Sequence, residues 1–220
     1  MIARWGIVPI LVSWTVAGWG AWLLPEGLPR DIGLAVAIAL GLFVLWFFRS
    51  PRRTPPPGPH RLVAPADGVV WDVDELTEPV VIGGPARRIG IFLSVFDVHV
   101  NRSPCAGTVT YAAYRPGRFL DVRHPDCAER NEANTLGIAC ADEVGKDIRI
   151  VVRQLAGLIA RRIICTHGVG DRLARGELFG MIRFGSRTEL YVPMDRPHTV
   201  LVKRGDRVKG GETVLVEFTP

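Results

Sequence analysis

An eight-residue pattern occurs twice in the chain, as GDRLARGE at residues 170–177 and as GDRVKGGE at residues 205–212. Its Gly-Asp pair favours a tight turn, and the residues that follow favour a short strand. The sequence around both copies has the same character, because short β-rich runs alternate with glycine and proline. These runs are residues 68–73, 89–95, 107–113, 148–155, 163–167, 189–192, 199–202 and 213–218. The pattern predicts a mainly β domain over residues 61–220.

Two segments of this domain depart from the strand pattern. Residues 115–132 are predicted to form a long polar loop, and residues 154–162 a weak helix. The repeated turn resembles the one that orders barrel-sandwich domains of the lipoyl and biotinyl type. Carrier domains of that type need a lysine at the tip of a hairpin, and no M-K-M-like triplet is present. The resemblance therefore implies a barrel-sandwich-like fold without the carrier function.

The first 48 residues have a different composition. Two runs without charge, residues 5–24 and 32–48, flank the turn-like sequence PEGLPRD at 25–31. At about 1.5 Å per residue, the first run is long enough to cross a hydrocarbon core of about 30 Å, and the second is near the lower limit. A transmembrane helical hairpin is predicted. A signal peptide or a buried core hairpin is disfavoured, because no small-residue cleavage site follows and a core helix of this length usually has a polar face.

Arginines cluster after the second run, at positions 49, 52, 53 and 61. By the positive-inside rule they predict a cell (inner) membrane protein whose following domain faces the cytoplasm. Residues 49–60 are basic and rich in proline, which favours a stiff extended linker. The predicted organisation is a membrane anchor over residues 1–48, a linker over 49–60 and the β domain over 61–220.

The charge of the chain limits its partners. Lys and Arg number 27 against 22 Asp and Glu, which gives a formal net charge of +5. This surplus suits phosphate groups of nucleic acid or of anionic lipid. No RNP-like strand or helix-turn-helix pattern accompanies it, so no nucleic-acid partner is expected. The four cysteines form no C-x-x-C pair and the five histidines no metal-ligand spacing, so no metal is expected.

Three motifs stand out in the β domain: APADGVV at residues 64–70, FLSVFDVHVNRSP at 92–104 and FGMIRFGSRTELYVP at 179–193. In this order they resemble the phosphatidylserine decarboxylase proenzymes, in their short bacterial and archaeal form. The resemblance extends from about residue 60 to the end, and the predicted hairpin matches the family's usual membrane anchor. It implies a pyruvoyl-dependent lyase that converts phosphatidylserine to phosphatidylethanolamine and carbon dioxide in phospholipid biosynthesis.

The resemblance also implies that the chain cleaves itself between Gly185 and Ser186. Ser186 would attack the carbonyl of Gly185 to give an ester, and elimination and hydrolysis would leave a pyruvoyl group in place of Ser186. The β chain, residues 1–185, and the α chain, residues 186–220, would remain a heterodimer, and a higher oligomer stays open. The pyruvoyl group would form a Schiff base with phosphatidylserine in the membrane and accept electrons as carbon dioxide leaves. No metal is implied.

Further catalytic residues are carried over from longer members of the family. Asp67 matches the aspartate of a charge relay that acts with the serine. In the pattern D-Y-H-x-x-H-x-P, His99 occupies the first histidine position, and Arg102 stands where the relay histidine would be. Either His99 is the base that activates Ser186, or strain at the scissile bond drives the cleavage.

Three residues are candidate substrate contacts under the same resemblance: Arg102, Arg187 and Glu132. Arg187 would hold the lipid phosphate or lie on a strand edge, and Glu132 would reach the site or pair with a surface arginine. A rival hypothesis is a non-catalytic adaptor subunit of an efflux assembly, which also combines an anchor with such turns. Adaptors of that kind need long coiled-coil heptads, and the sequence has none.

Overall fold

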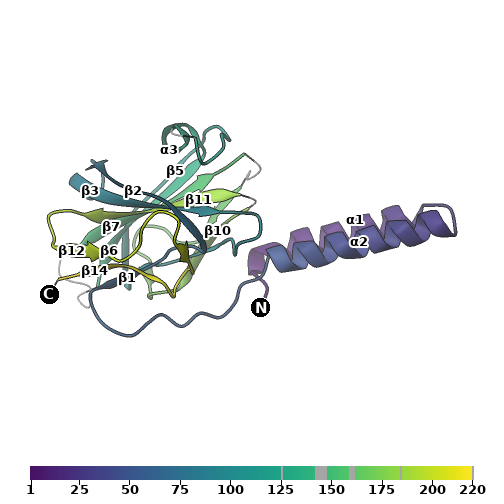
Figure 1. The fold of residues 1–220 in the computed structure, drawn as a ribbon, viewed down its shortest axis with the longest axis horizontal. Coiled ribbons are helices and arrows are strands. Elements are labelled where there is room, and N and C mark those ends of the chain that lie inside the picture. Colours follow the sequence, from purple (N-terminus) through teal and green to yellow (C-terminus); the bar gives the residue numbers. More distant parts are fainter. Residues whose placement is uncertain (125, 142–147, 159–161, 184, 220) are drawn as a thin grey trace. The chain divides into compact units, whose positions relative to one another are not determined.

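The structure, a computed structural model, describes most of the chain. The described residues are 1–124, 126–141, 148–158, 162–183 and 185–219. By its internal contacts the chain forms two compact units, Met1–Arg52 and Arg53–Pro220. The first unit is helical and the second is mainly β (Figure 1).

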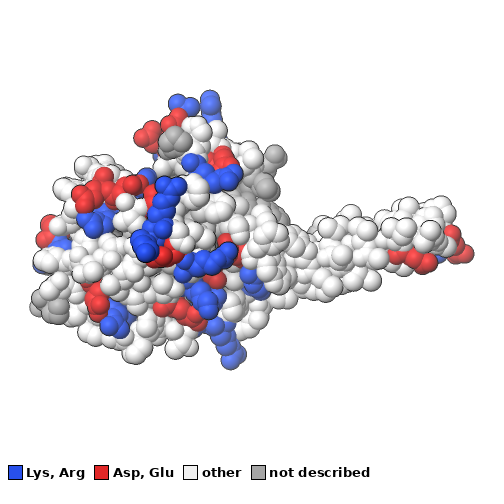
Figure 2. Space-filling view, in the orientation of Figure 1, with Lys and Arg blue, Asp and Glu red and all other residues white. Residues whose placement is uncertain are grey.

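The helical unit contains a 3₁₀ turn, η1 (Arg4–Gly6), followed by α1 (Ile7–Trp22) and α2 (Leu28–Phe47). The two helices pack closely where a small residue allows it, since a Cβ on Gly41 would lie 2.6 Å from the ring of Trp14. Figure 2 shows their surface as almost free of charge except near one end. Within the described residues, α2 is the one helix long and apolar enough to span a membrane.

The relative lengths of the two helices differ from the prediction. By the length of its uncharged run, the first helix is predicted to span the membrane more readily than the second. In the structure, however, α1 has 16 residues and α2 has 20. Helix α2 begins before its uncharged run because Pro29 is favourable in a first helical turn, as is the negative charge of Asp31. Helix α1 starts only after η1, which shortens it.

The β unit is built around one curled antiparallel sheet of eight strands, in the order β13-β2-β3-β11-β7-β6-β5-β9 (Figure 1). Their bounds are β2 (Gly68–Glu78), β3 (Gly84–Leu93), β5 (Gly107–Arg115), β6 (Ala133–Cys140), β7 (Arg149–Ala156), β9 (Arg172–Leu173), β11 (Ser186–Pro193) and β13 (Arg207–Val208). Strand β11 lies inside the sheet, so its backbone is hydrogen-bonded on both sides, to β3 and to β7.

Two three-stranded sheets complete the core. One is β1 (Arg61–Val63), β14 (Val214–Phe218) and β12 (His198–Val200), and the other is β4 (Val100–Arg102), β10 (Leu178–Ile182) and β8 (Ile163–Cys165). Inward side chains of all three sheets, among them Ile91, Leu190 and Phe179, form one apolar cluster. Burial of such side chains is the main force that holds the strands together.

Both copies of the repeat form the same turn, as predicted. Gly170 and Gly205 each have a φ of 95°, a conformation that favours glycine. The carboxylates of Asp171 and Asp206 each accept a backbone N–H from three residues earlier. The strands that follow, β9 and β13, pair with β5 and β2 at opposite edges of the large sheet. The repeat therefore borders the sheet on both sides.

The mainly β prediction is confirmed, although strands β1, β4, β6 and β10 lie outside the predicted runs. Strand β6 was missed, because its sequence ANTLGIAC has low β-propensity and the strand depends on pairing with β5 and β7. The predicted helix 154–162 is wrong at its start, where residues 154–156 belong to β7, and residues 159–161 lie outside the described residues. The predicted loop 115–132 contains a short helix, α3 (Cys127–Arg130).

Candidate active site

The structure brings Gly185, Ser186 and His99 together. Ser186 is the first residue of β11, where it pairs with Leu93 of β3 and Ala156 of β7. His99 directly precedes β4, and its side chain is fully buried, as is that of Ser186. The backbone N–H of Gly185 donates a hydrogen bond to Nε2 of His99 at 3.3 Å. The structure thus holds Gly185, the residue before the predicted scissile bond, against a buried imidazole.

The contacts of the His99 ring identify its basic nitrogen. Nδ1 lies 3.0 Å from the carbonyl oxygen of Asp97, and a carbonyl only accepts, so Nδ1 carries the proton. Nε2 then has the lone pair, in agreement with its acceptance of the N–H of Gly185. The nitrogen with the lone pair therefore lies at the backbone N–H of Gly185, in the peptide unit directly before the Gly185–Ser186 bond.

The hydroxyl of Ser186 makes no hydrogen bond that would stabilise the fold. Its Oγ is buried and has no hydrogen-bond partner among the described residues, although buried hydroxyls usually have one. Gly185 has a φ of 63°, in the left-handed region where a side chain is disfavoured. A buried hydroxyl without a structural contact, next to a peptide bond in a left-handed turn, suits an intramolecular nucleophile.

A row of buried, hydrogen-bonded amide side chains lies on the same sheet face as Ser186. It is not among the site residues predicted from the sequence. Asn134 donates to Gln154 Oε1 at 3.0 Å, and Gln154 donates to Asn101 Oδ1 at 2.8 Å. Asn101 in turn donates to Thr188 Oγ1 at 3.0 Å. Thr188 shares a face of β11 with Ser186, because residues two apart in a strand point the same way. Polar residues at inward strand positions were the signal available in the sequence.

Asp67 and Arg102 belong to a charged cluster near the repeated turns. The carboxylate of Asp67 accepts a hydrogen bond from Arg53 at 2.9 Å, and Arg53 also pairs with Glu212 at 2.9 Å. Arg102 donates to the carbonyl of Gly176 at 2.8 Å, and burial lowers its pKa, as does the nearby charge of Arg53. Arg53 thus contacts the second copy of the repeat through Glu212, and Arg102 contacts the first copy through Gly176.

Arg187 lies on the opposite face of β11 from Ser186, since adjacent residues in a strand alternate. Its two Nη atoms donate to the carboxylate of Asp72 at 2.7 and 2.8 Å, and its Nε donates to Glu189 at 2.9 Å. Although burial lowers the pKa of Arg187, Glu189 and Asp72 raise it above its ordinary value. The guanidinium is engaged by its own sheet, which favours a structural role.

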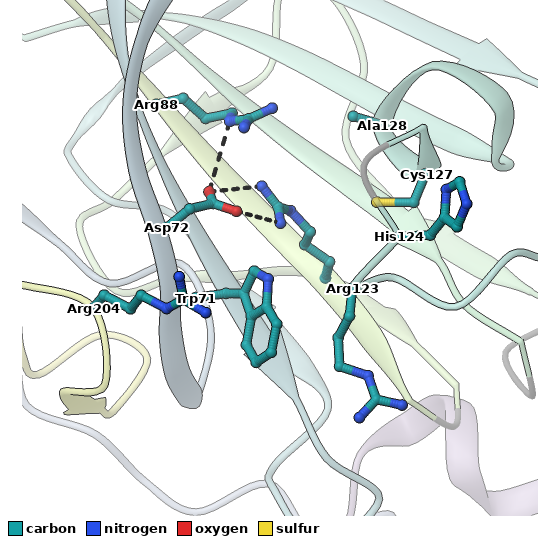
Figure 3. A pocket seen from close by; sticks show the side chains of 9 residues that line it. Trp71, Asp72, Arg88, Arg123, His124, Cys127, Ala128 and Arg204 are labelled. Atoms are coloured by element: carbon teal, nitrogen blue, oxygen red, sulfur yellow. Dashed lines mark hydrogen bonds and ion pairs between the residues drawn. The ribbon is translucent and has the colours of Figure 1, made fainter.

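This ion-pair network forms one wall of a pocket of about 310 Å³. Figure 3 shows Asp72 with Arg88 on one side and Trp71 and Arg204 on the other. The guanidinium of Arg204 lies 5.2 Å from the ring centre of Trp71, a cation–π distance. The pocket is on the face of the sheet away from Ser186.

Replacing Glu189 by Gln is expected to destabilise the β unit by about 3–5 kcal/mol, because it leaves buried Arg187 with one carboxylate fewer. Glu75 pairs with Arg87 at an exposed site, so Glu75→Gln is expected to cost less than about 1 kcal/mol. Thermal unfolding of both variants measures the difference. Equal melting temperatures would contradict the expectation.

Glu132 is buried two strands away from Ser186. Its carbonyl oxygen accepts the N–H of Ala156, which pairs with Ser186 in the sheet. Its carboxylate accepts a hydrogen bond from the Tyr114 hydroxyl at 3.1 Å. The structure therefore places Glu132 in the neighbourhood of the scissile bond with its side chain engaged by Tyr114.

A second pocket, of about 320 Å³, reaches Gly185 itself. Its lining is mainly apolar and includes Phe96 and Leu158, each 65% exposed. Asp121 and Arg123 also line it, and Arg123 donates to Asp121 at 2.9 Å. Hydrogen bonds from Arg123 lower the pKa of Asp121 to about 2, so both groups are charged at neutral pH. The sequence motifs predict no role for this pair.

The other reactive side chains are placed less favourably. Among residues with described positions, no three His, Cys, Asp or Glu converge as a metal site. The cysteines are free thiols, and burial raises the pKa of Cys127 and Cys165, which keeps them protonated at neutral pH. Ser186 and His99 are the residues whose geometry best suits covalent chemistry.

Comparison with known proteins shows the family of the chain. The family model described as phosphatidylserine decarboxylase matches residues 40–216. Relatives named phosphatidylserine decarboxylase proenzyme include one from Symbiobacterium thermophilum, 50% identical over 82% of this chain and 81% of the relative. One from Carboxydothermus hydrogenoformans is 48% identical over 84% and 83%, and one from Rhodopirellula baltica is 41% identical over 94% and 81%. The chain belongs to the phosphatidylserine decarboxylase family.

Proposed function

We propose that this phosphatidylserine decarboxylase is made as a proenzyme that matures by cleaving its own Gly185–Ser186 bond. One observation carries the proposal. The Ser186 hydroxyl is buried without a partner among the described residues, and it follows Gly185, whose own backbone N–H donates to the basic nitrogen of His99.

The cleavage proceeds by steps that the chain's own residues supply. Oγ of Ser186 attacks the carbonyl carbon of Gly185, and its proton passes to Nε2 of His99. Transfer of a proton to the amide nitrogen then breaks the C–N bond, which leaves Gly185 as an ester on Ser186. Loss of the α-proton expels Gly185 as a carboxylate, and water releases the nitrogen as ammonia. Residues 186–220 then begin with a pyruvoyl group.

The surroundings of residue 186 fit such a group. Converting the side chain removes no hydrogen bond made to a described residue, because Ser186 Oγ makes none. Strand β11 pairs with β3 and β7 along its length, which supports retention of residues 186–220 after cleavage. The group supplies a carbonyl that binds the substrate amine and accepts the electron pair released with carbon dioxide. His99 holds the proton that is returned to the substrate carbon.

The pocket that reaches Gly185 takes the phosphatidylserine headgroup. That headgroup carries an ammonium, a carboxylate and a phosphate, and Asp121 and Arg123 offer charges of both signs. The exposed apolar side chains of Phe96 and Leu158 suit the glycerol and acyl parts of the lipid. Arg102, Arg187 and Glu132 are not assigned a substrate contact, because they are buried and their side chains are engaged within the fold, whereas the side chains of Asp121 and Arg123 are exposed.

Arg123→Gln is expected to raise the KM for phosphatidylserine about tenfold or more, since a hydrogen bond to a charged group contributes roughly 1.5–3 kcal/mol. Chain cleavage should be unaffected, because Arg123 does not contact Ser186 or His99 among the described contacts. Arg130→Gln is the matched control, from the same segment and paired with Asp126. Carbon dioxide release against lipid mole fraction in mixed micelles gives the KM. An unchanged KM for Arg123→Gln would remove this residue from the substrate site.

We further propose that α1 and α2 form a transmembrane hairpin that anchors a cytoplasmic catalytic domain at the cell membrane. The apolar length of α2 and the exposed apolar side chains of both helices support it. In this assignment residues 1–48 are the anchor, 49–60 the linker and 61–220 the catalytic domain. The two like turns at opposite edges of the large sheet support a barrel-sandwich-like fold for that domain.

Intact-mass spectrometry of the purified protein tests the proposed function. The expected result is two co-purifying chains, residues 1–185 and 186–220, with the smaller one blocked at its N-terminus by a ketone that reacts with hydrazine. A folded, membrane-bound protein that stays a single unblocked chain would overturn it.

A further inference from the structure

The residue after β7, Gly157, is packed directly against the scissile peptide. Gly157 is buried, and it follows Ala156, which pairs with Ser186. A Cβ built on Gly157 would lie 2.3 Å from the carbonyl oxygen of Gly185 and 3.2 Å from its carbonyl carbon. Contacts of a Cβ below 3.0 Å essentially never occur in proteins. The carbonyl of Gly185 therefore occupies the space that any side chain at position 157 would take.

Gly157 and Gly185 meet at this contact, and a different physical constraint favours glycine at each of the two positions. Gly185 has a φ of 63° and open space around the position of a Cβ. Gly157 is absent from the residues with positive φ, so its backbone conformation is open to other amino acids. At Gly185 the backbone conformation favours glycine, and at Gly157 the close approach of the carbonyl does.

We propose that Gly157 is a positioning residue for self-cleavage, because its bare Cα lets the Gly185 carbonyl lie against the end of β7 in the orientation that Ser186 attacks. This inference rests on the proposed self-cleavage. Gly157 takes part in no bond change: the Oγ–C bond forms, the hydroxyl proton goes to His99, and the C–N bond breaks when the nitrogen is protonated. A methyl group at position 157 would displace the carbonyl oxygen and turn the peptide plane away from Oγ.

The expected effect on the cleavage rate is large. Displacement of a reacting group by about 1 Å lowers a rate by about 10²-fold. The methyl of an alanine at position 157 must be accommodated by a shift of that order, because the carbonyl is backbone and has no flexible end. Gly157→Ala is therefore expected to slow cleavage by on the order of 10²-fold, with the fold retained.

Gly168→Ala is the matched control. Gly168 also lies outside the regular strands, has no positive φ, and has no heavy atom within 4 Å of the position of a Cβ. Both variants are followed by intact mass over time after synthesis, by circular dichroism, and by treatment of the folded protein with hydroxylamine, which cuts the ester at Gly185. Wild type and Gly168→Ala should give residues 1–185 and 186–220. Gly157→Ala should accumulate residues 1–220, resist hydroxylamine and keep the wild-type spectrum.

The outcomes separate this inference from the proposed function. Absence of cleavage in wild type overturns the proposed function itself. Cleavage of Gly157→Ala at the wild-type rate overturns only the role of Gly157, and so does an ester that forms and is cut by hydroxylamine. If Gly157→Ala loses its fold, the double variant Gly157→Ala/Val122→Ala is tested instead. Besides the Gly185 backbone, the atom nearest to the new methyl is Cγ1 of Val122, at 3.1 Å, so shortening Val122 makes room for the methyl. A folded, uncleaved double variant supports the inference, whereas a cleaved or an unfolded one overturns it.

Discussion

Ser186→Ala is expected to remain one chain of residues 1–220, with no pyruvoyl group and no decarboxylation. An alanine has no oxygen to attack the carbonyl of Gly185. The melting temperature should stay close to that of the uncleaved wild type. Removing a buried hydroxyl that has no partner within the described structure loses no hydrogen bond, so the change in stability should be small or favourable.

Ser103→Ala provides the contrast. Ser103 is equally buried, but its hydroxyl donates to the carbonyl oxygen of Cys105 at 2.7 Å. Its removal is expected to cost about 1 kcal/mol of stability while cleavage continues. Intact mass and thermal unfolding of both variants give the comparison. A Ser186→Ala protein that is still cut before residue 186 would show that another group starts the reaction.

His99→Gln is expected to slow self-cleavage by about 10²–10⁴-fold, the usual contribution of a general base. Glutamine keeps an oxygen that accepts the N–H of Gly185, so the local structure is preserved, but it cannot take up the proton of Ser186. Wild type and variant are compared at the same neutral pH.

His198→Gln is the matched control for this experiment. Its Nδ1 lies 2.8 Å from the carbonyl oxygen of Arg196, the same local arrangement that His99 has with Asp97. It should cleave at the wild-type rate. The rate constants follow from the fraction of uncleaved chain against time. Wild-type kinetics in His99→Gln would favour strain at the scissile bond over base catalysis.

The sequence was informative where a motif determines local chemistry. The Gly185–Ser186 step and His99 were predicted from their motifs, and the structure brings all three together. The repeated turn was also predicted from the sequence, because Gly-Asp turns depend on backbone conformation within a few residues. Strand β6 was not, because ANTLGIAC has little preference of its own and is a strand only through two partners distant in the sequence.

For the remaining candidate residues, the partners of each side chain are set by the tertiary structure. Arg187 is next to Ser186 in the sequence, but strand alternation sends its side chain to the other face of β11, into the pair with Asp72. Asp67 meets Arg53 in a charged cluster near the repeated turns. Neither partner is visible from the motif, because each contact joins segments that only folding brings together.

By itself, the sequence determined the mainly β character of residues 61–220 and the apolar N-terminal segment, since periodicity and composition are local properties. The Gly185–Ser186 cleavage was predicted from the resemblance of its motifs to those of a known family. Only the tertiary structure decided which face each side chain of β11 takes and that Gly157 lies against the carbonyl of Gly185. These depend on the pairing of β11 with β3 and β7, and strand register is set by contacts between segments far apart in the chain.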